Sequence, residues 1–232
     1  MQIGLLQCGY FPQPDAHPKV TYSDLYANML KGNGFSFRTW SVVDMDFPAS
    51  AHEADAWLLS GSRHGAYEDI PFIPPLERFI REIYSAQVPM VGICFGHQVV
   101  AQALGGKVIK GPKGWNCGRN TYDIEGQEKT LIAWHQDEVV SAPPEAKVVG
   151  SSAQCDISFI RYQGKAFTMQ PHPEFGDDAL RIVMDGPSGK LLSKEQMARV
   201  RAGLGTPHDN VWMASEIARF FKHVGDSDHL PG

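Results

Sequence analysis

The sequence predicts an α/β fold in which helices flank an open, mostly parallel sheet. Short apolar runs of strand length alternate along the chain with longer stretches in which apolar residues recur at helical spacing. This alternation is typical of parallel sheets covered by helices. The length of 232 residues suits one medium domain with a short appendage. Together these observations favour a single α/β unit over an all-helical or all-β chain.

The elements follow in chain order from apolar runs, helical periodicity and turn residues. Strands are expected at 3–6, 35–42, 56–59 and 89–93. Helices are expected at 22–30, 76–84 and 97–104, the first stopped by glycines at 32 and 34 and the last by a glycine at 105. Further β-like runs lie at 107–109, 130–134, 147–151, 157–162 and 166–170. Two more helices are expected, one from Ser193, where Gln196 completes a capping-box pattern, and one from about Asp209.

The chain shows no internal repeat, low-complexity tract or linker. We therefore expect residues 1–184 to form the α/β domain. Residues 185–232 are expected to form a C-terminal helical extension packed on the same domain, and the sequence gives this extension no role of its own.

Composition excludes several classes of function. The net charge is −5 and no segment gathers Lys and Arg, which argues against nucleic acid or an anionic membrane as the main partner. No stretch approaches the roughly 20 apolar residues of a membrane span, and the N-terminus lacks the pattern of a signal peptide. The four cysteines have no CxxC spacing, so we expect reduced thiols in a cytoplasmic protein.

One cysteine stands apart from the other three. Cys94 lies in a G-x-C-x-G string at 92–96, which follows a predicted strand and precedes a predicted helix. This is the thiol version of a nucleophile elbow, where glycines allow a strained backbone and a close approach. A helix N-terminus also favours the thiolate over the thiol. A lone cysteine at a turn is usually inert, but strand, glycines and helix together predict a nucleophile.

A thiol nucleophile needs a base, and the base needs an orienting group. His172 and Glu174 follow the run 166–170 in a Gln-Pro-His-Pro-Glu segment. Proline favours extended geometry at the residue before it, and in an extended segment residues two apart project to the same side. We therefore expect Glu174 to orient His172, which in turn takes and returns the proton of Cys94.

At these residues the sequence resembles the class I glutamine amidotransferases. Residues 92–98 and 172–174 match the two hallmark motifs of that family in order and approximate separation. Residues 59–63 match its oxyanion-loop position and 134–139 its substrate-binding turn, both more weakly. The resemblance covers roughly residues 1–180 and is similar in particular to stand-alone members that look like the glutaminase part of GMP synthase. It implies a flavodoxin-like sheet.

The resemblance also implies a reaction and a set of site residues. Glutamine would be hydrolysed to glutamate and ammonia through a γ-glutamyl thioester on the cysteine. Backbone N–H groups of Phe95 and of Gly61 or Ser62 would form the oxyanion hole. The substrate would be held by four further residues, namely Gln98, His135, Gln136 and Asp137. His135 and Asp137 could instead be metal ligands, but without a third ligand the pair is weak, and we expect no metal.

Two other functions remain open from the sequence. A γ-glutamyl hydrolase would use the same three residues on a γ-glutamyl amine or peptide, and a non-catalytic flavodoxin-like module would leave them unused. No phosphate-binding G-x-x-x-x-G-K-[ST] motif occurs, so we expect no nucleotide cofactor. The expected partners are therefore a small γ-glutamyl substrate and, for an amidotransferase, a synthase that consumes the ammonia.

Overall fold

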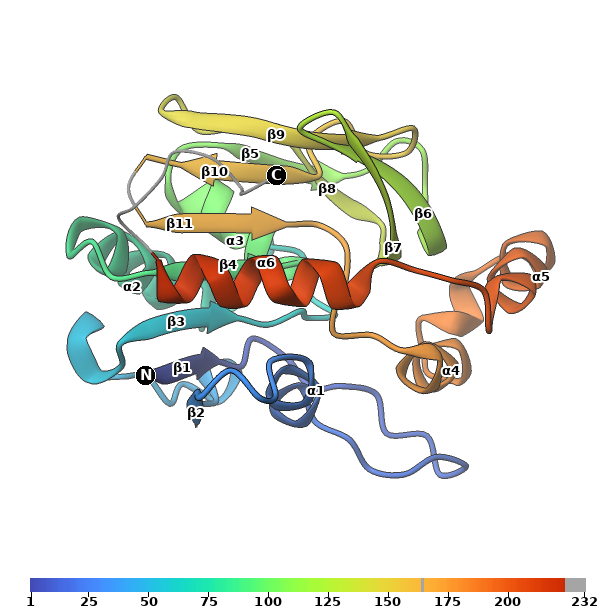
Figure 1. Cartoon of the computed structure of the whole chain (residues 1–232), viewed down its shortest axis with the longest axis horizontal. Helices are drawn as coiled ribbons and strands as arrows, with labels where there is room; N and C mark the ends of the chain where they lie inside the picture. Colours follow the sequence, from blue (N-terminus) through green and yellow to red (C-terminus); the bar gives the residue numbers. More distant parts are fainter. Residues whose placement is uncertain (164, 224–232) are drawn as a thin grey trace.

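A single large sheet forms the centre of the molecule. The structure is a computed structural model that describes residues 1–163 and 165–223. Nine strands form the sheet in the order β2-β1-β3-β4-β11-β10-β9-β6-β7 (Figure 1). Their bounds are β1 Gln2–Leu6, β2 Ser36–Trp40, β3 Ala56–Leu59, β4 Met90–Ile93, β6 Asn116–Ile124, β7 Gln127–His135, β9 Ala146–Ser152, β10 Phe159–Tyr162 and β11 Ala166–Met169. A small second sheet pairs β5 (Lys107–Lys110) with β8 (Asp137–Ser141).

The large sheet has a parallel half and an antiparallel half. Strands β2, β1, β3, β4 and β11 pair in parallel, whereas every pairing from β11 through β10, β9 and β6 to β7 is antiparallel. The predicted α/β fold class is therefore confirmed. Because β3, β4 and β11 are parallel neighbours, the residues that follow them meet at one edge, which is where open α/β sheets bind ligands.

Helices cover both faces of the parallel half. The six helices among the described residues are α1 Tyr22–Met29, α2 Ile73–Ser85, α3 Phe95–Ala103, α4 Asp177–Asp185, α5 Lys194–Gly203 and α6 Asn210–Lys222. One apolar cluster joins the sheet to α1, α4 and α6, and a second joins it to α2 and α3. Figure 1 shows α6 crossing the near face of the sheet with α2 and α3 behind it. The two clusters give the sheet a core on each side.

The C-terminal segment packs on the antiparallel half as well as on the core. Val200 of α5 lies against Gly118 of β6, whose φ of 81° is a conformation that favours glycine. Arg119 of the same strand forms an ion pair at 2.7 Å with Asp177 of α4, the helix that leads into the extension. Residues 185–223 of the expected extension thus contact the sheet through helices, while 224–232 lie outside the described residues. None of the described helices has the length and apolar character needed to cross a membrane.

Local signals account for most element ends. Ser193 and Gln196 form the predicted capping box, in which each side chain bonds the other's backbone. The expected strand at 35–42 ends at Trp40, because Val42 begins a short 3-10 turn. The expected helix at 97–104 starts two residues earlier, at Phe95, with Cys94 as its N-cap residue.

Besides short 3-10 turns, two strands and one α-helix were not predicted from the sequence. They are β6, β8 and α4. Polar residues interrupt the apolar pattern of β6, and Gly118 breaks its extended backbone. Strand β8 occupies part of the segment that was assigned to a substrate-binding turn. Strand β6 forms a tight hairpin with β7, the next element of the chain, whereas β8 pairs with β5, which lies about 30 residues earlier. Helix α4 does carry the helical signal, because its apolar residues Leu180, Ile182 and Val183 are buried on one face.

Candidate active site

Cys94 stands on a strained turn between β4 and α3. Its φ of 54° and ψ of −105° are rare for a residue with a side chain. Its N–H donates to Met169 O of β11 at 2.9 Å, which ties the turn to the neighbouring strand. A Cβ at Gly92 would lie 2.6 Å from Gly96 O, and one at Gly96 would lie 2.5 Å from Leu59 O. Only glycines therefore fit at these two positions, and helix α3 can approach the sheet closely.

His172 and Glu174 lie in a tight turn that follows β11. The N–H of Phe175 donates to His172 O at 3.2 Å, and Pro173 occupies the second position of the turn, where its fixed φ is favourable. The expected extended geometry for this segment is therefore wrong. His172 and Glu174 meet because the chain turns between them, although the expected pairing of the two side chains is present.

The imidazole of His172 links the thiol to the carboxylate. Its Nδ1 lies 2.7 Å from Glu174 Oε1, and Cys94 is near enough to the ring to affect its pKa. All three residues are buried. Burial lowers the pKa of His172, but the charges of Glu174 and the Cys94 thiolate, with the hydrogen bonds to both, outweigh it and raise that pKa well above its ordinary value. The arrangement thus favours the imidazolium form of His172 at neutral pH.

Two aromatic residues that the sequence did not indicate support this pair. The hydroxyl of Tyr26, a buried residue of α1, donates to Glu174 Oε1 at 3.3 Å and accepts from the N–H of Gly61 at 3.4 Å. The ring of Phe175 stacks on that of His172, with centroids 4.1 Å apart and planes 10° apart. Adjacency to the His-Pro-Glu segment could have indicated Phe175, whereas nothing near Tyr26 marks it in the sequence.

The expected oxyanion residues lie on both sides of Cys94. Phe95 opens α3, where the first N–H groups have no acceptor within the helix. Gly61 follows β3, and a Cβ there would lie 3.1 Å from His172 Cε1 and 2.8 Å from Tyr22 Oη. Gly61 therefore borders the imidazole directly. The hydroxyl of Ser62 accepts the N–H of His64 at 3.2 Å and so orders the same loop.

The four expected substrate residues are close together, and each makes a hydrogen bond to another group of the protein. Gln98 Nε2 donates to Asp137 O at 2.9 Å. The ring of His135 is 3.0 Å from Asp137 O through Nδ1 and 3.2 Å from Asn116 Nδ2 through Nε2. Gln136 O accepts the N–H of Gly111, and the Asp137 carboxylate accepts the Tyr67 hydroxyl at 3.1 Å. These contacts fix the start of β8 beside the elbow.

Two other buried histidines are held neutral. Burial lowers the pKa of His97 to about 3 and that of His135 to about 4. His97 bonds Thr168 Oγ1 and Ile157 O, so it joins α3 to β11 and to the segment that precedes β10. Among residues 1–163 and 165–223, no group of three or more His, Cys, Asp or Glu side chains is arranged to hold a metal ion.

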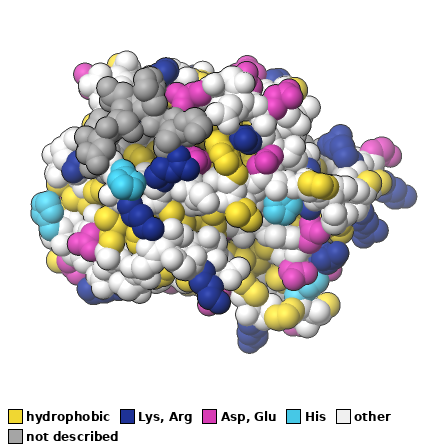
Figure 2. Space-filling view, in the orientation of Figure 1, with side chains coloured by type: hydrophobic (Ala, Val, Ile, Leu, Met, Phe, Trp, Pro, Cys, Tyr) yellow, Lys and Arg dark blue, Asp and Glu magenta, His cyan; other side chains and the backbone are white. Residues whose placement is uncertain are grey.

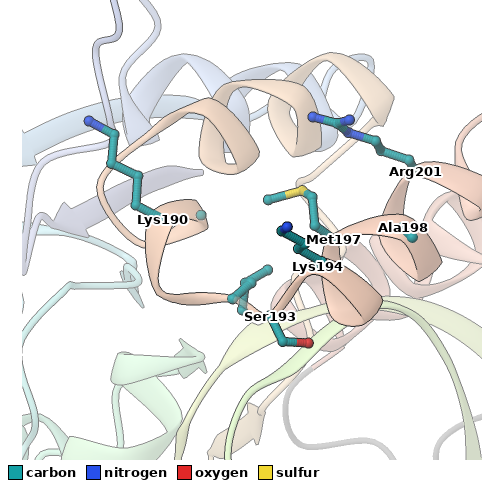
Figure 3. Close-up of a pocket in the computed structure, with 8 residues that line it drawn as sticks. Lys190, Ser193, Lys194, Met197, Ala198 and Arg201 are labelled. Atoms are coloured by element: carbon teal, nitrogen blue, oxygen red, sulfur yellow. The ribbon is translucent and has the colours of Figure 1, made fainter.

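A cavity of about 610 Å³ lies elsewhere, between the short turn Gly189–Leu191 and α5. Figure 3 shows Lys190, Lys194 and Arg201 around it, with Met197 between them. In Figure 2 several Lys and Arg side chains gather over this end of the molecule, interspersed with acidic ones. None of the lining residues belongs to the elbow or to the 172–175 turn, so this cavity is separate from the Cys94 site.

Fold and site together define an α/β protein with a cysteine elbow facing a histidine–carboxylate pair. A thiol, an imidazole and a carboxylate in series are the kinds of group that cysteine-dependent acyl transfer uses. The family model described as glutamine amidotransferase class-I matches residues 22–180. The chain therefore belongs to the class I glutamine amidotransferase family, which confirms the resemblance found in the sequence.

Individual relatives agree with this assignment. Gamma-glutamyl peptidase 4 of Arabidopsis thaliana is 29% identical over 71% of this chain and 72% of its own. A glutamine-hydrolysing GMP synthase subunit of Methanopyrus kandleri is 33% identical over 45% of this chain and 64% of its own. The crystal structure of a glutamine amidotransferase from Methylobacillus flagellatus matches with a TM-score of 0.74 at 20% identity, covering 99% of this chain and 98% of the other.

Proposed function

We propose that this chain hydrolyses the side-chain amide of glutamine through a γ-glutamyl thioester on Cys94. The buried series of contacts from Cys94 through His172 to Glu174 supports this proposal most directly. It combines a strained nucleophile, a base in contact with it and an acid that fixes the base. Belonging to the glutamine amidotransferase family supports the choice of substrate.

The first half of the reaction forms the thioester. The Cys94 thiolate attacks the γ-carbonyl carbon, and the carbonyl oxygen becomes an oxyanion held by the N–H groups of Phe95 and Gly61. The C–N bond of the tetrahedral intermediate then breaks, and the amide nitrogen takes the proton of the His172 imidazolium and leaves as ammonia. In the free protein the Gly61 N–H donates a long hydrogen bond to the Tyr26 hydroxyl. The oxyanion of the intermediate is charged and is therefore a stronger acceptor for this N–H than the hydroxyl is.

The second half of the reaction releases glutamate. Neutral His172 takes a proton from water, and the resulting hydroxide attacks the thioester carbon. Collapse of this intermediate breaks the C–S bond, which restores the thiolate and the imidazolium, and the released γ-carboxylic acid ionises. Glu174 keeps its contact with Nδ1 throughout, so that the other ring nitrogen remains directed at the reacting atoms.

The substrate is proposed to lie between the elbow and the start of β8. Gln98, His135, Gln136 and Asp137 border that space, and their mutual hydrogen bonds order it before substrate arrives. Burial raises the pKa of the Asp137 carboxyl, but its hydroxyl partner Tyr67 favours the ionised form. A carboxylate there suits the α-ammonium group of a γ-glutamyl compound.

A second candidate is hydrolysis of a γ-glutamyl peptide or amine. The relative named gamma-glutamyl peptidase is similar over 71% of this chain, whereas the GMP synthase relative is similar over 45%. The same three residues serve either reaction, and only the leaving group differs. With glutamine as substrate, a synthase partner that consumes ammonia is part of the proposal, whereas a γ-glutamyl peptidase needs none.

Covalent trapping tests the proposal together with product analysis. A γ-glutamyl electrophile should add one equivalent to the intact protein, with the modified peptide containing Cys94, and Cys94→Ala should not react. Purified protein should then release glutamate from glutamine, and the ratio of kcat/KM for glutamine and for a γ-glutamyl dipeptide separates the two candidates. Absence of both the adduct and glutamate release from either substrate would refute the proposal.

A further inference from the structure

The start of α6 lies against the turn that carries His172 and Glu174. Asn210, the first residue of that helix, is 4% exposed. Its Nδ2 is 2.6 Å from Phe175 O and 3.5 Å from His172 O, which are the two carbonyl groups at the ends of the turn. Its Oδ1 has no hydrogen-bond partner among the described residues, so Asn210 contributes here as a donor.

The helix start is itself fixed to the open edge of the sheet. The N–H of Asp209 donates to Thr130 O, and the Asp209 carboxylate accepts the Thr130 N–H, both at 2.7 Å. Two residues further along β7, Ile132 O accepts the N–H of His172 at 2.7 Å. Because β7 is the last strand of the sheet, alternate residues present these backbone groups away from β6. One strand edge therefore binds both the turn and the residue that contacts it.

We propose that Asn210 is a positioning residue of the active site and that the C-terminal extension is, through it, part of the hydrolytic machinery. The inference rests on the proposed function, because it concerns the residues proposed to act as base and acid. Asn210 touches neither side chain. It holds the two carbonyl groups between which the His172 ring, the Glu174 carboxylate and the stacked Phe175 ring are arranged.

Loss of the amide leaves the turn held by the His172 N–H on Ile132 O and by the long hydrogen bond from Tyr26 to Glu174. The imidazole then samples positions from which it cannot reach the Cys94 sulfur, although the fold around it is retained. Rate depends steeply on such placement, and a displacement of about 1 Å costs about 100-fold. The substrate residues at 98 and 135–137 lie on other elements, so substrate binding should change little.

The test compares Asn210→Ala and Asn210→Asp with a control on the same helix. Ser215→Ala is the control, because Ser215 Oγ also donates to a backbone carbonyl, that of Val211, but within α6. We expect both Asn210 variants to lose about 10- to 100-fold in kcat with KM within about twofold. Asn210→Asp keeps the shape and loses the donors, so it should be no better than Asn210→Ala. Ser215→Ala should keep the wild-type kcat.

A substrate-free measurement separates positioning from general destabilisation. The rate at which iodoacetamide alkylates Cys94, measured against pH on folded protein, reports how the His172 ring is placed beside the sulfur, because the thiolate is the reactive form. We expect the acidic limb of this profile to move to higher pH in both Asn210 variants and to stay in place in Ser215→Ala. If Asn210→Ala yields no folded protein, Asn210→Ser, which retains one donor, replaces it and should show a smaller shift of the same sign.

The outcomes distinguish this inference from the proposed function. Wild-type kcat and an unmoved alkylation profile in Asn210→Ala would overturn the positioning role while leaving hydrolysis intact. Wild-type protein that hydrolyses no γ-glutamyl substrate would overturn the proposed function, but the alkylation profiles would still decide whether Asn210 positions His172. A shift in all three variants, the control included, would indicate general loosening of α6 and would also overturn the role.

Discussion

Cys94 and the His172–Glu174 pair follow adjacent parallel strands, but the protein holds them in different ways. The elbow is fixed by its own sequence, since Gly92 and Gly96 permit a backbone that nearly touches the flanking chain. The turn is fixed from outside, by β7, by Asn210 of α6 and by Tyr26 of α1. The proposed nucleophile thus depends mainly on local strain and the proposed base mainly on distant contacts, so different mutations should damage each.

Removal of the nucleophile should have the largest effect. Cys94→Ala should reduce hydrolysis by about 10⁵-fold or more, because the other proposed groups cannot form the thioester. A glutamate-release assay at substrate saturation measures this, with Cys117→Ala as the control expected to remain within a few-fold of wild type. Substantial turnover by Cys94→Ala would mean that the elbow is not the site of chemistry.

On the turn, we expect His172→Ala to lower kcat more than Glu174→Gln does. The loss of kcat in Glu174→Gln should be smaller than the roughly 10⁴-fold loss seen for the corresponding change in a serine triad. An amide can still hold the ring, but it lacks the charge that raises the pKa of His172. The rate should fall as pH rises through this pKa, so the alkaline limb of kcat/KM should move to lower pH in Glu174→Gln. An unmoved limb would contradict the charge argument.

An added methyl group at the elbow should lower the free energy of unfolding more than an added methyl group beside the 172–175 turn. Gly96→Ala places a Cβ 2.5 Å from Leu59 O, against backbone that cannot move aside, and should lower the free energy of unfolding by about 1–3 kcal/mol. Gly176→Ala is the matched control, because nothing lies within 4 Å of its Cβ, and it should cost less than about 1 kcal/mol. Denaturant unfolding measures both, and equal costs would remove the contrast between the regions.

The smallest effect concerns the buried neutral histidine beside the turn. The pKa of His135 is lowered to about 4, so between about pH 6.5 and pH 4 the unfolded chain binds a proton that the folded chain does not. The free energy of unfolding should therefore decrease as the pH is lowered through that window, by at most about 1.4 kcal/mol per pH unit for this residue. His135→Gln should show a shallower decline than wild type in thermal unfolding scans from pH 7 to 5. Parallel declines would show that His135 titrates normally in the folded protein.

The same contrast decides how much the sequence could predict. The apolar strand at 90–93, the glycines on either side of Cys94 and the helix that follows all lie within residues 90–103, so this short segment can be interpreted by itself. His172 and Glu174 could be paired from adjacency, but the turn that joins them was expected to be extended. Asn210 contacts the turn across 38 and 35 residues, and Tyr26 does so across 148. These contacts depend on the order of strands in the sheet, including β6, whose interrupted pattern conceals the strand.

The pairing of Asp209 with Thr130 also bears on how the protein matures during synthesis. Cys94, His172 and Glu174 have all left the ribosome before residues 209 and 210 do. Until those two residues arrive, the open edge of β7 lacks its cover and the turn lacks the Asn210 donor. The nascent chain should therefore carry the full set of reactive groups in a latent form. Hydrolysis would reach its full rate only when α6 docks, so the synthesis of that helix would complete the site.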